Sequence, residues 1–243
     1  MAVQYLRSLV FFVWMYGLMA VMGVLGAPFA IASRRGASRV MWLYTEIVLR
    51  SMALICGLRA EVRGPVPTGE VVVASKHQSF LDILILFNAL NDARFVMKRS
   101  LRWTPFLGVY AMRIGCAPVN RGAGAKAAQG LADHAEARRG SNGQTIIFPQ
   151  GTRVAPGATA PYKGGVHGMA EALNVPVIPA ATNAGLFWPR LGILRKPGVA
   201  VVEFLPELEP GLARKEMTRA LEAVIEPASD ALAAEARAAD PRL

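Results

Sequence analysis

The chain has 243 residues, 53% of them hydrophobic, and a formal net charge of +10 at pH 7. This length suits one catalytic domain with an ample core and a small appended element. The charge indicates an anionic partner, and the mean hydropathy of +0.33 favours an acidic lipid surface over nucleic acid. The two cysteines, Cys56 and Cys116, have neither the spacing of a zinc site nor that of a disulfide framework, and we expect buried free thiols.

The first predicted element is an apolar helix near the N-terminus. Residues 8–33 contain no charged side chain, and a helix of about 20 apolar residues is long enough to cross a bilayer core. Arg34, Arg35 and Arg39 follow directly, which favours keeping that end in the cytoplasm. Two interpretations remain open: a membrane-embedded hairpin formed with the next segment, or a signal peptide cleaved after the small-x-small pattern at residues 30–32.

The second apolar segment covers residues 40–58. Glu46 and Arg50 stand four residues apart, so on a helix they share one face and can form an ion pair. The remaining surface is apolar, which favours a helix that lies in or dips into the membrane interface. An ordinary core helix of the globular domain is the alternative.

After a proline- and glycine-rich segment at residues 63–69, short β-branched runs alternate with helical patterns. Strands are predicted at residues 70–75, 145–148, 175–182 and 199–205, and helices at residues 80–90, 126–139, 165–173 and 212–238. The alanine-rich end of the last helix is expected to be solvated. The alternation predicts an α/β fold with a mixed, largely parallel sheet flanked by helices. We divide the chain into N-terminal membrane-associated helices, residues 1–60, and a catalytic domain, residues 61–243.

The charge is concentrated in the middle of the chain. Residues 93–170 contain eleven lysines and arginines against two acidic side chains. Such an imbalance raises the local concentration of anions over the site that this region builds. Nucleic acid is a poor candidate, because no zinc finger, basic helix with heptads or aromatic RNA-binding run accompanies the charge.

The most informative short stretch is KHQSFLD, residues 76–82, at the junction between a predicted strand and a predicted helix. Ligands commonly bind at this edge of an open α/β sheet. A neutral imidazole at His77 can take a proton from an alcohol if a carboxylate, here Asp82, fixes its tautomer and stabilises the imidazolium. Two structural alternatives exist: Asp82 can cap the helix through the S-x-x-D pattern, and His77 can be a hydrogen-bonded loop residue.

Three further motifs follow in order: APVNRG at residues 117–122, IIFPQGTR at residues 146–153 and VPVIPAATN at residues 175–183. In the second, Gly151 permits a tight turn and Arg153 offers a planar fork for phosphate oxygens. Each motif alone is ordinary loop chemistry. Their order and spacing, together with H-x-x-x-x-D, resemble the glycerolipid acyltransferase family from about residue 71 to residue 209.

The resemblance implies roles for specific residues. His77 is the implied general base and Asp82 its orienting partner. Lys98 and Arg153 are implied to hold the phosphate of the acceptor, with Arg121 and the Gly151-Thr152 turn shaping that pocket and Lys163 nearby. The family usually carries glutamate before Gly-Thr-Arg, whereas this chain has Gln150. We include Gln150 among the candidate substrate-binding residues, and its neutral side chain puts the identity of the acceptor in question.

The resemblance also implies the activity. An acyl chain passes from an acyl-CoA or acyl carrier protein thioester, as co-substrate, to the 2-hydroxyl of lysophosphatidic acid. The expected partners are the lysophospholipid, the thioester donor, acyl carrier protein and membrane lipids, with no cofactor, metal or nucleic acid. The expected location is the bacterial inner membrane, with the catalytic domain on the cytoplasmic side and the two N-terminal helices dipping into one leaflet.

Other functions are weighed against this one. A different lysolipid acceptor, such as a lyso-ornithine lipid, and a non-catalytic binder of acidic lipids are the two alternatives. A serine hydrolase, a zinc hydrolase and a P-loop enzyme are disfavoured, because the chain contains no G-x-S-x-G, H-E-x-x-H or Gly-Lys-Ser/Thr motif.

Overall fold

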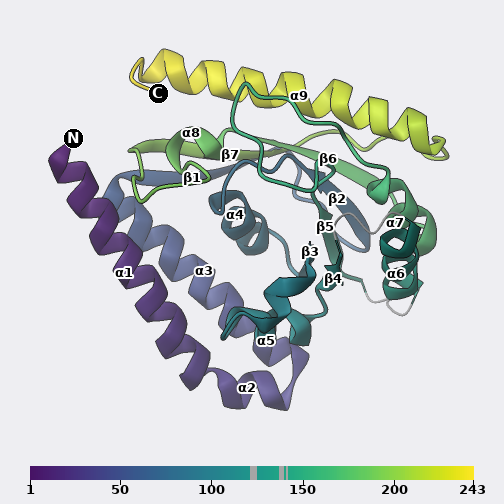
Figure 1. The fold of residues 1–243 in the computed structure, drawn as a ribbon, viewed down its shortest axis with the longest axis horizontal. Coiled ribbons are helices and arrows are strands. Elements are labelled where there is room, and N and C mark those ends of the chain that lie inside the picture. The colour runs from purple at the N-terminus through teal and green to yellow at the C-terminus, as the bar shows by residue number, and fades with distance from the viewer. Residues whose placement is uncertain (121–124, 137–139, 141) are drawn as a thin grey trace.

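A computed structural model describes residues 1–120, 125–136, 140 and 142–243 (Figure 1). The strands are β1 Leu58–Arg63, β2 Val71–Ser75, β3 Ala93–Lys98, β4 Ala117–Val119, β5 Gln144–Ile147, β6 Val177–Thr182 and β7 Gly198–Phe204. The helices are α1 Ala2–Leu25, α2 Ala27–Ala32, α3 Arg34–Cys56, α4 Leu81–Ala89, η1 Arg99–Trp103, α5 Leu107–Ile114, α6 Ala125–Glu136, α7 Gly165–Leu173, α8 Ala184–Phe187 and α9 Arg214–Ala239.

The strands of the described residues form one sheet in the order β1-β7-β6-β2-β5-β3-β4. Every neighbouring pair is parallel except β6 and β7, which are antiparallel. The predicted α/β fold with a mixed, largely parallel sheet is therefore confirmed. Because β6, β2, β5 and β3 run in the same direction, the loops that follow them meet at one edge of the sheet.

Strand β2 lies at the centre of the sheet. All five of its residues are buried, as expected of a parallel strand with helices on both faces. Its side chains alternate between two cores: Val73 belongs to the core under α3 and α4, and Val72 and Ala74 belong to the core under α7 and α9. The residues just after β2 are therefore directed to opposite faces of the sheet in turn.

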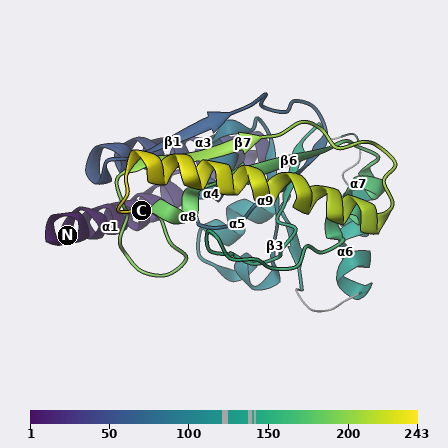
Figure 2. The same ribbon diagram turned by 90° about the horizontal axis from the view of Figure 1, so that it is seen from above.

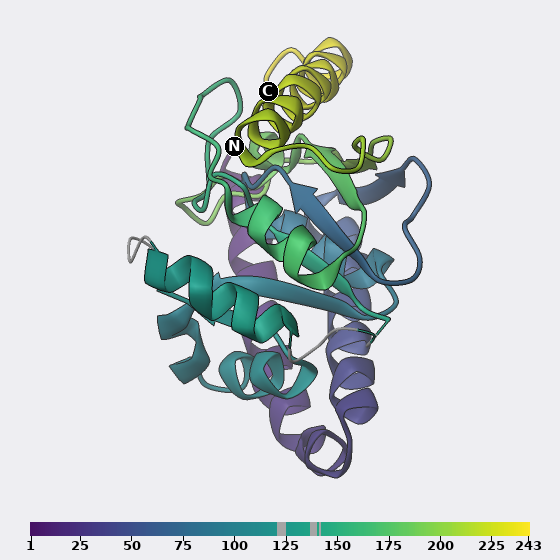
Figure 3. The ribbon, with the colours of Figure 1, turned by 90° about the vertical axis from the view of Figure 1, so that its right-hand side faces the viewer.

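Helices cover both faces. α1, α3, α4 and α5 pack on one face, and α6, α7 and α9 pack on the other (Figures 1 and 3). Helix α9 crosses over β7 and β6, as the view from above shows (Figure 2). The sequence led us to expect a solvated C-terminal half. The structure differs, because Leu232 and Ala233 are buried against the sheet.

The two long N-terminal helices lie side by side and are joined by α2 (Figure 1). Phe11 and Met15 of α1 are fully or almost fully buried in the core, an arrangement expected of a helix that belongs to the folded protein and not of a removable signal segment. The opposite face of α1 is exposed and apolar, and α1 is long and apolar enough to cross a membrane by length and composition. Helix α3 has features of both a core helix and an interfacial helix. Val48 and Met52 are buried, while Leu54 is 86% exposed.

Several local predictions are confirmed. Glu46 and Arg50 form the expected ion pair, with 2.5 Å between Oε1 and Nε, and both cysteines are buried thiols outside any disulfide of the described residues. The predicted strands and helices of the catalytic domain are present with ends shifted by at most two residues. In the helix predicted at residues 126–139, residues 137–139 lie outside the described residues. Strands β1, β3 and β4 and helix α5 were not predicted. Helix α3 begins at Arg34, six residues before the predicted segment.

Candidate active site

His77 and Asp82 meet at the junction between β2 and α4. The Nδ1 atom of His77 lies 2.9 Å from Oδ1 of Asp82, and both side chains are buried. A carboxylate can only accept this hydrogen bond, so Nδ1 carries the proton and Nε2 keeps its lone pair. The pair therefore has the arrangement required of a histidine that accepts a proton from a substrate hydroxyl.

The second oxygen of Asp82 organises the loop. Oδ2 accepts hydrogen bonds from the backbone N–H groups of Gln78 at 2.8 Å and Ser79 at 2.7 Å. The structural alternative for Asp82 is thus also present: the same carboxylate that holds His77 reaches back to the start of the helix. Three donors converge on one carboxylate that is fully buried, so its orientation is fixed.

Neighbouring elements hold the His77 ring and its loop. The ring stacks on Phe148, with 3.9 Å between ring centroids and 16° between the planes. The carbonyl of His77 accepts a hydrogen bond from the N–H of Val154 at 2.8 Å, which ties the loop after β2 to the loop after β5. The Ser79 hydroxyl donates to the carbonyl of Trp188 at 2.6 Å, so the segment after α8 is attached as well.

A cavity of about 470 Å³ opens beside His77. Its polar lining includes His77, Lys98, Thr152, Arg153 and Arg190, and no described lining residue is acidic. Lys98, Arg153 and Arg190 carry positive charge that no carboxylate of the lining offsets, so they create a positive electrostatic potential in the cavity. An anionic group of a substrate is attracted to the same region as the histidine.

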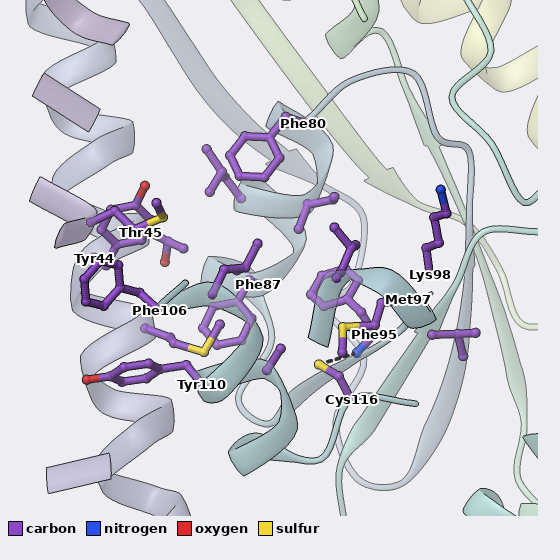
Figure 4. Close-up of a pocket in the computed structure, with 18 of the residues that line it drawn as sticks. Tyr44, Thr45, Phe80, Phe87, Phe95, Met97, Lys98, Phe106, Tyr110 and Cys116 are labelled. Atoms are coloured by element: carbon purple, nitrogen blue, oxygen red, sulfur yellow. Dashed lines mark hydrogen bonds between the residues drawn. The ribbon is translucent and has the colours of Figure 1, made fainter. Parts of the chain in front are cut away.

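The rest of the lining is mostly apolar and comes mainly from α1, α3, α4, β3 and α5. Figure 4 shows Tyr44, Phe106 and Tyr110 gathered on one side of the cavity and Lys98 on the other. The Tyr110 hydroxyl donates to the carbonyl of Gly23 at 3.1 Å, which joins α5 to α1. The cavity therefore combines a cationic part near the histidine with an apolar part between the N-terminal helices and α4.

The structure brings together some of the predicted site residues and separates others. His77, Lys98, Thr152 and Arg153 line the cavity, and Asp82 lies directly behind His77. Gln150 is only 3% exposed and does not line the cavity, because its amide is directed to Glu226 of α9.

The remaining predicted residues lie around the turn. Gly151 has a φ of +68°, the left-handed conformation that favours glycine, which confirms the predicted tight turn. Lys163 is exposed, and its Nζ lies over Gly151, 3.2 Å from the position that a Cβ would occupy there. Arg121 lies outside the described residues.

Two features of the site were missed in the sequence. Arg190 follows α8 and lies outside the basic region that drew attention, and nothing in its neighbourhood forms a recognisable motif. Glu226 belongs to a predicted helix that no motif connected to the site, yet its carboxylate contacts Lys76, the residue before His77. Only tertiary structure brings these residues to the loops after β2 and β5.

The chain is similar to known proteins in sequence and in structure. A family model described as acyltransferase matches residues 59–183. A 1-acyl-sn-glycerol-3-phosphate acyltransferase of Pseudomonas aeruginosa is 31% identical over 64% of this chain and 61% of the relative, and one of Escherichia coli is 29% identical over 71% of both. The crystal structure of a 1-acyl-sn-glycerophosphate acyltransferase from Thermotoga maritima superposes with a TM-score of 0.76 at 19% identity, covering 94% of this chain and 97% of that one.

The chain matches about three fifths of the length of two of its relatives. The match spans 61% of the Pseudomonas relative and 58% of the mouse enzyme named 1-acyl-sn-glycerol-3-phosphate acyltransferase alpha. The matched part contains His77, Asp82, Lys98 and Arg153.

Proposed function

Because the chain belongs to the acyltransferase family, we propose that it is a 1-acyl-sn-glycerol-3-phosphate O-acyltransferase. It transfers an acyl chain from the thioester of acyl-CoA or acyl carrier protein to the 2-hydroxyl of lysophosphatidic acid and produces phosphatidic acid. The observation that carries this proposal is the buried His77–Asp82 pair beside a cavity that combines cations with a long apolar lining.

The proposed reaction needs one base and no covalent acyl-enzyme. Nε2 of His77 takes the proton of the lysolipid hydroxyl as the hydroxyl oxygen attacks the thioester carbonyl carbon. The tetrahedral intermediate then collapses, the C–S bond breaks, and the leaving sulfur takes the proton back from the imidazolium. Asp82 holds the imidazole in the required tautomer and stabilises the imidazolium between these two steps.

The cavity supports this assignment of both substrates. We assign Lys98 and Arg153, which line the cavity, to the phosphate of lysophosphatidic acid, because an arginine fork and a lysine ammonium both suit phosphate oxygens. The reacting carbonyl has to lie near His77, so we assign the apolar part of the cavity to the transferred acyl chain. Holding both substrates in attack geometry contributes much of the remaining rate acceleration.

We place the enzyme on the cytoplasmic side of the bacterial inner membrane. The exposed apolar face of α1 and the arginines at the start of α3 support this placement, because the former suits the acyl region of a leaflet and the latter its anionic headgroups. A lysolipid in that leaflet then reaches the cavity, which α1 itself helps to line, without crossing bulk water.

A thiol-release assay tests the proposal. Detergent-solubilised protein is given acyl-CoA or acyl carrier protein thioester with lysophosphatidic acid or a lyso-ornithine lipid, and the diacyl product is identified by mass spectrometry. We expect release that requires lysophosphatidic acid. Release only with the ornithine lipid would replace the acceptor, and no release with any pair, while lysolipid still binds, would replace the enzyme with a lipid-binding protein.

A further inference from the structure

A buried polar cluster lies behind the catalytic loop. The Lys76 ammonium contacts both carboxylate oxygens of Glu226, each at 2.6 Å, and the Lys76 side chain is only 2% exposed. The Tyr162 hydroxyl donates to Oε1 of Glu226 at 2.7 Å, and the Gln150 amide donates to the same oxygen at 3.3 Å. Glu226 is thus the shared acceptor for three side chains, one from the loop after β2 and two from the connection between β5 and α7.

The cluster lies on the face of the sheet opposite the cavity. His77 lines the cavity, whereas the preceding residue, Lys76, points to α9, in keeping with the alternation along β2. Gln150 has the same relation to Arg153: it lies behind the turn whose arginine enters the cavity. A single carboxylate on α9 therefore connects the loop of the general base to the loop of a proposed phosphate ligand.

The surroundings of Gln150 require a donor at this position. Its Nε2 lies between two acceptors, Oε1 of Glu226 at 3.3 Å and the carbonyl of Ala160 at 3.4 Å. An ionised glutamate at residue 150 would bring an oxygen to that place, and two carboxylates this close in a buried site repel each other. The neutral residue in the turn therefore follows from the presence of Glu226.

We propose that Glu226 is a positioning residue for the acyl transfer proposed above, on which this inference rests: it fixes the His77 loop relative to the Arg153 loop, and Gln150 serves as its hydrogen-bond donor and does not recognise the acceptor. Removal of Glu226 leaves the buried Lys76 charge without a partner, so the two loops lose their common attachment. A shift of about 1 Å between reacting groups costs as much as 10²-fold in rate.

The test compares two carboxylates of the same helix. Glu226→Gln removes the proposed positioning charge, and Glu235→Gln is the matched control, because Glu235 forms a bidentate pair with Arg63 of β1 far from the cavity. Gln150→Glu and the exchange Gln150→Glu/Glu226→Gln complete the set. For each protein we would measure kcat, the acceptor KM, and hydrogen exchange of the amides of Lys76 and Val154.

We expect Glu226→Gln and Gln150→Glu each to lower kcat by about tenfold or more with a smaller change in acceptor KM, and the exchange variant to recover part of the loss of Gln150→Glu. Amides of both loops should exchange faster in Glu226→Gln, while Glu235→Gln keeps kcat and exchange close to wild type. The kcat/KM ratio between lysophosphatidic acid and lyso-ornithine lipid should be the same for wild type and Gln150→Glu.

Two results would overturn the inference: equal effects of Glu226→Gln and Glu235→Gln on kcat and loop exchange, or a change of acceptor preference in Gln150→Glu. If the Glu226 variants do not fold, Lys76→Met/Glu226→Met removes both charges together, and wild-type kcat in this double variant would also contradict a positioning role. If wild-type protein releases no thiol with any acceptor, the proposed function fails, and hydrogen exchange alone then decides whether Glu226 holds the two loops.

Discussion

At the scale of single residues, Asp82 performs two tasks with two oxygens. Oδ1 orients His77, and Oδ2 accepts the N–H groups of Gln78 and Ser79. The S-x-x-D pattern and the H-x-x-x-x-D pattern overlap on this one carboxylate, and the structure satisfies both. Residue types in KHQSFLD were therefore sufficient to find the pair, because Asp82 accepts its hydrogen bonds from His77, Gln78 and Ser79, which are close to it in sequence.

Asp82→Asn separates geometry from charge. An asparagine side chain has one acceptor oxygen where three donors converge, so its amide nitrogen must face at least one of them. We expect kcat to fall by about 10²-fold or more, as it does when other histidine bases lose an orienting carboxylate. Steady-state thiol release measures kcat, and lysolipid binding to the same variant serves as the control. Unchanged turnover would show that His77 needs no orienting partner.

Tyr162 gives the cluster around Glu226 a pH signature. Burial, and then the hydrogen bond to Glu226, raise the pKa of Tyr162. In the unfolded chain a tyrosine loses its proton at about pH 10, whereas folded Tyr162 keeps it, so the unfolded state binds fewer protons above that pH. The contribution of Tyr162 to stability is therefore present below about pH 10 and is lost as the pH rises further.

Tyr162→Phe removes this titration. We expect the melting temperature of the variant to fall less steeply between about pH 9 and pH 11 than that of the wild type. Differential scanning fluorimetry over this range measures the two slopes. Equal slopes in the two proteins would contradict the account of Tyr162.

At the scale of elements, α1 lines the cavity and also carries the exposed apolar face that we propose meets the membrane. Gly23 lines the cavity, and a Cβ built there would overlap the ring of Phe106. Phe106 directly precedes α5 and also lines the cavity. The close approach of α1 and α5 thus depends on a residue without a side chain.

Gly23→Ala should narrow the apolar part of the cavity. We expect the preference for the acyl donor to move to shorter chains, with kcat/KM for the longest accepted chain falling by about tenfold, a typical effect of methylene-sized changes in apolar pockets. Gly17→Ala on the same helix is the control, since a Cβ there has no atom within 4 Å. The measurement is kcat/KM over a series of acyl-CoA lengths, and identical chain-length profiles for the two variants would refute the assignment.

The sequence located a strand where an uninterrupted apolar run marks it. Strands β2, β5, β6 and β7 lie inside the sheet and form apolar runs, so hydrophobicity alone located them. Strand β3 also lies inside the sheet but was missed, because Arg94 and Lys98 flank an apolar run of only three residues. Strand β1, at one edge, has the mixed sequence LRAEVR and is recognised only by its hydrogen-bonded pairing with β7. Strand β4, at the other edge, has only three residues. Arg190 and Glu226 reach the site through contacts with residues distant in sequence, and no local pattern reports such contacts.

At the scale of the whole molecule, charge and apolar surface act together. The net charge of +10 accompanies an α1 whose exposed face includes Leu9, Val13 and Trp14. An apolar helix face with arginines at its end suits the interface of an anionic leaflet. The cavity is lined partly by α1, so the proposed membrane surface and the proposed lipid site share one helix.

Leu9→Asp/Val13→Asp tests this surface. The two residues stand four apart on the exposed face of α1, so the charges should disrupt membrane contact with little effect on the core. We expect binding to vesicles that contain anionic lipid to weaken by about tenfold or more, and wild-type binding to weaken with added salt. Val66→Asp, on an exposed loop residue, is the control. Vesicle flotation that is equal for both variants would place the membrane contact elsewhere.

The measurement that tests the central claim most directly compares two histidines in one assay. His77→Ala removes the proposed general base, and His167→Ala removes a partly exposed histidine of α7 that does not line the cavity. With acyl thioester and lysophosphatidic acid, we expect thiol release by His77→Ala to fall by about 10²- to 10⁴-fold with lysolipid binding retained, and His167→Ala to keep wild-type turnover. Wild-type turnover in His77→Ala would contradict general-base catalysis by His77.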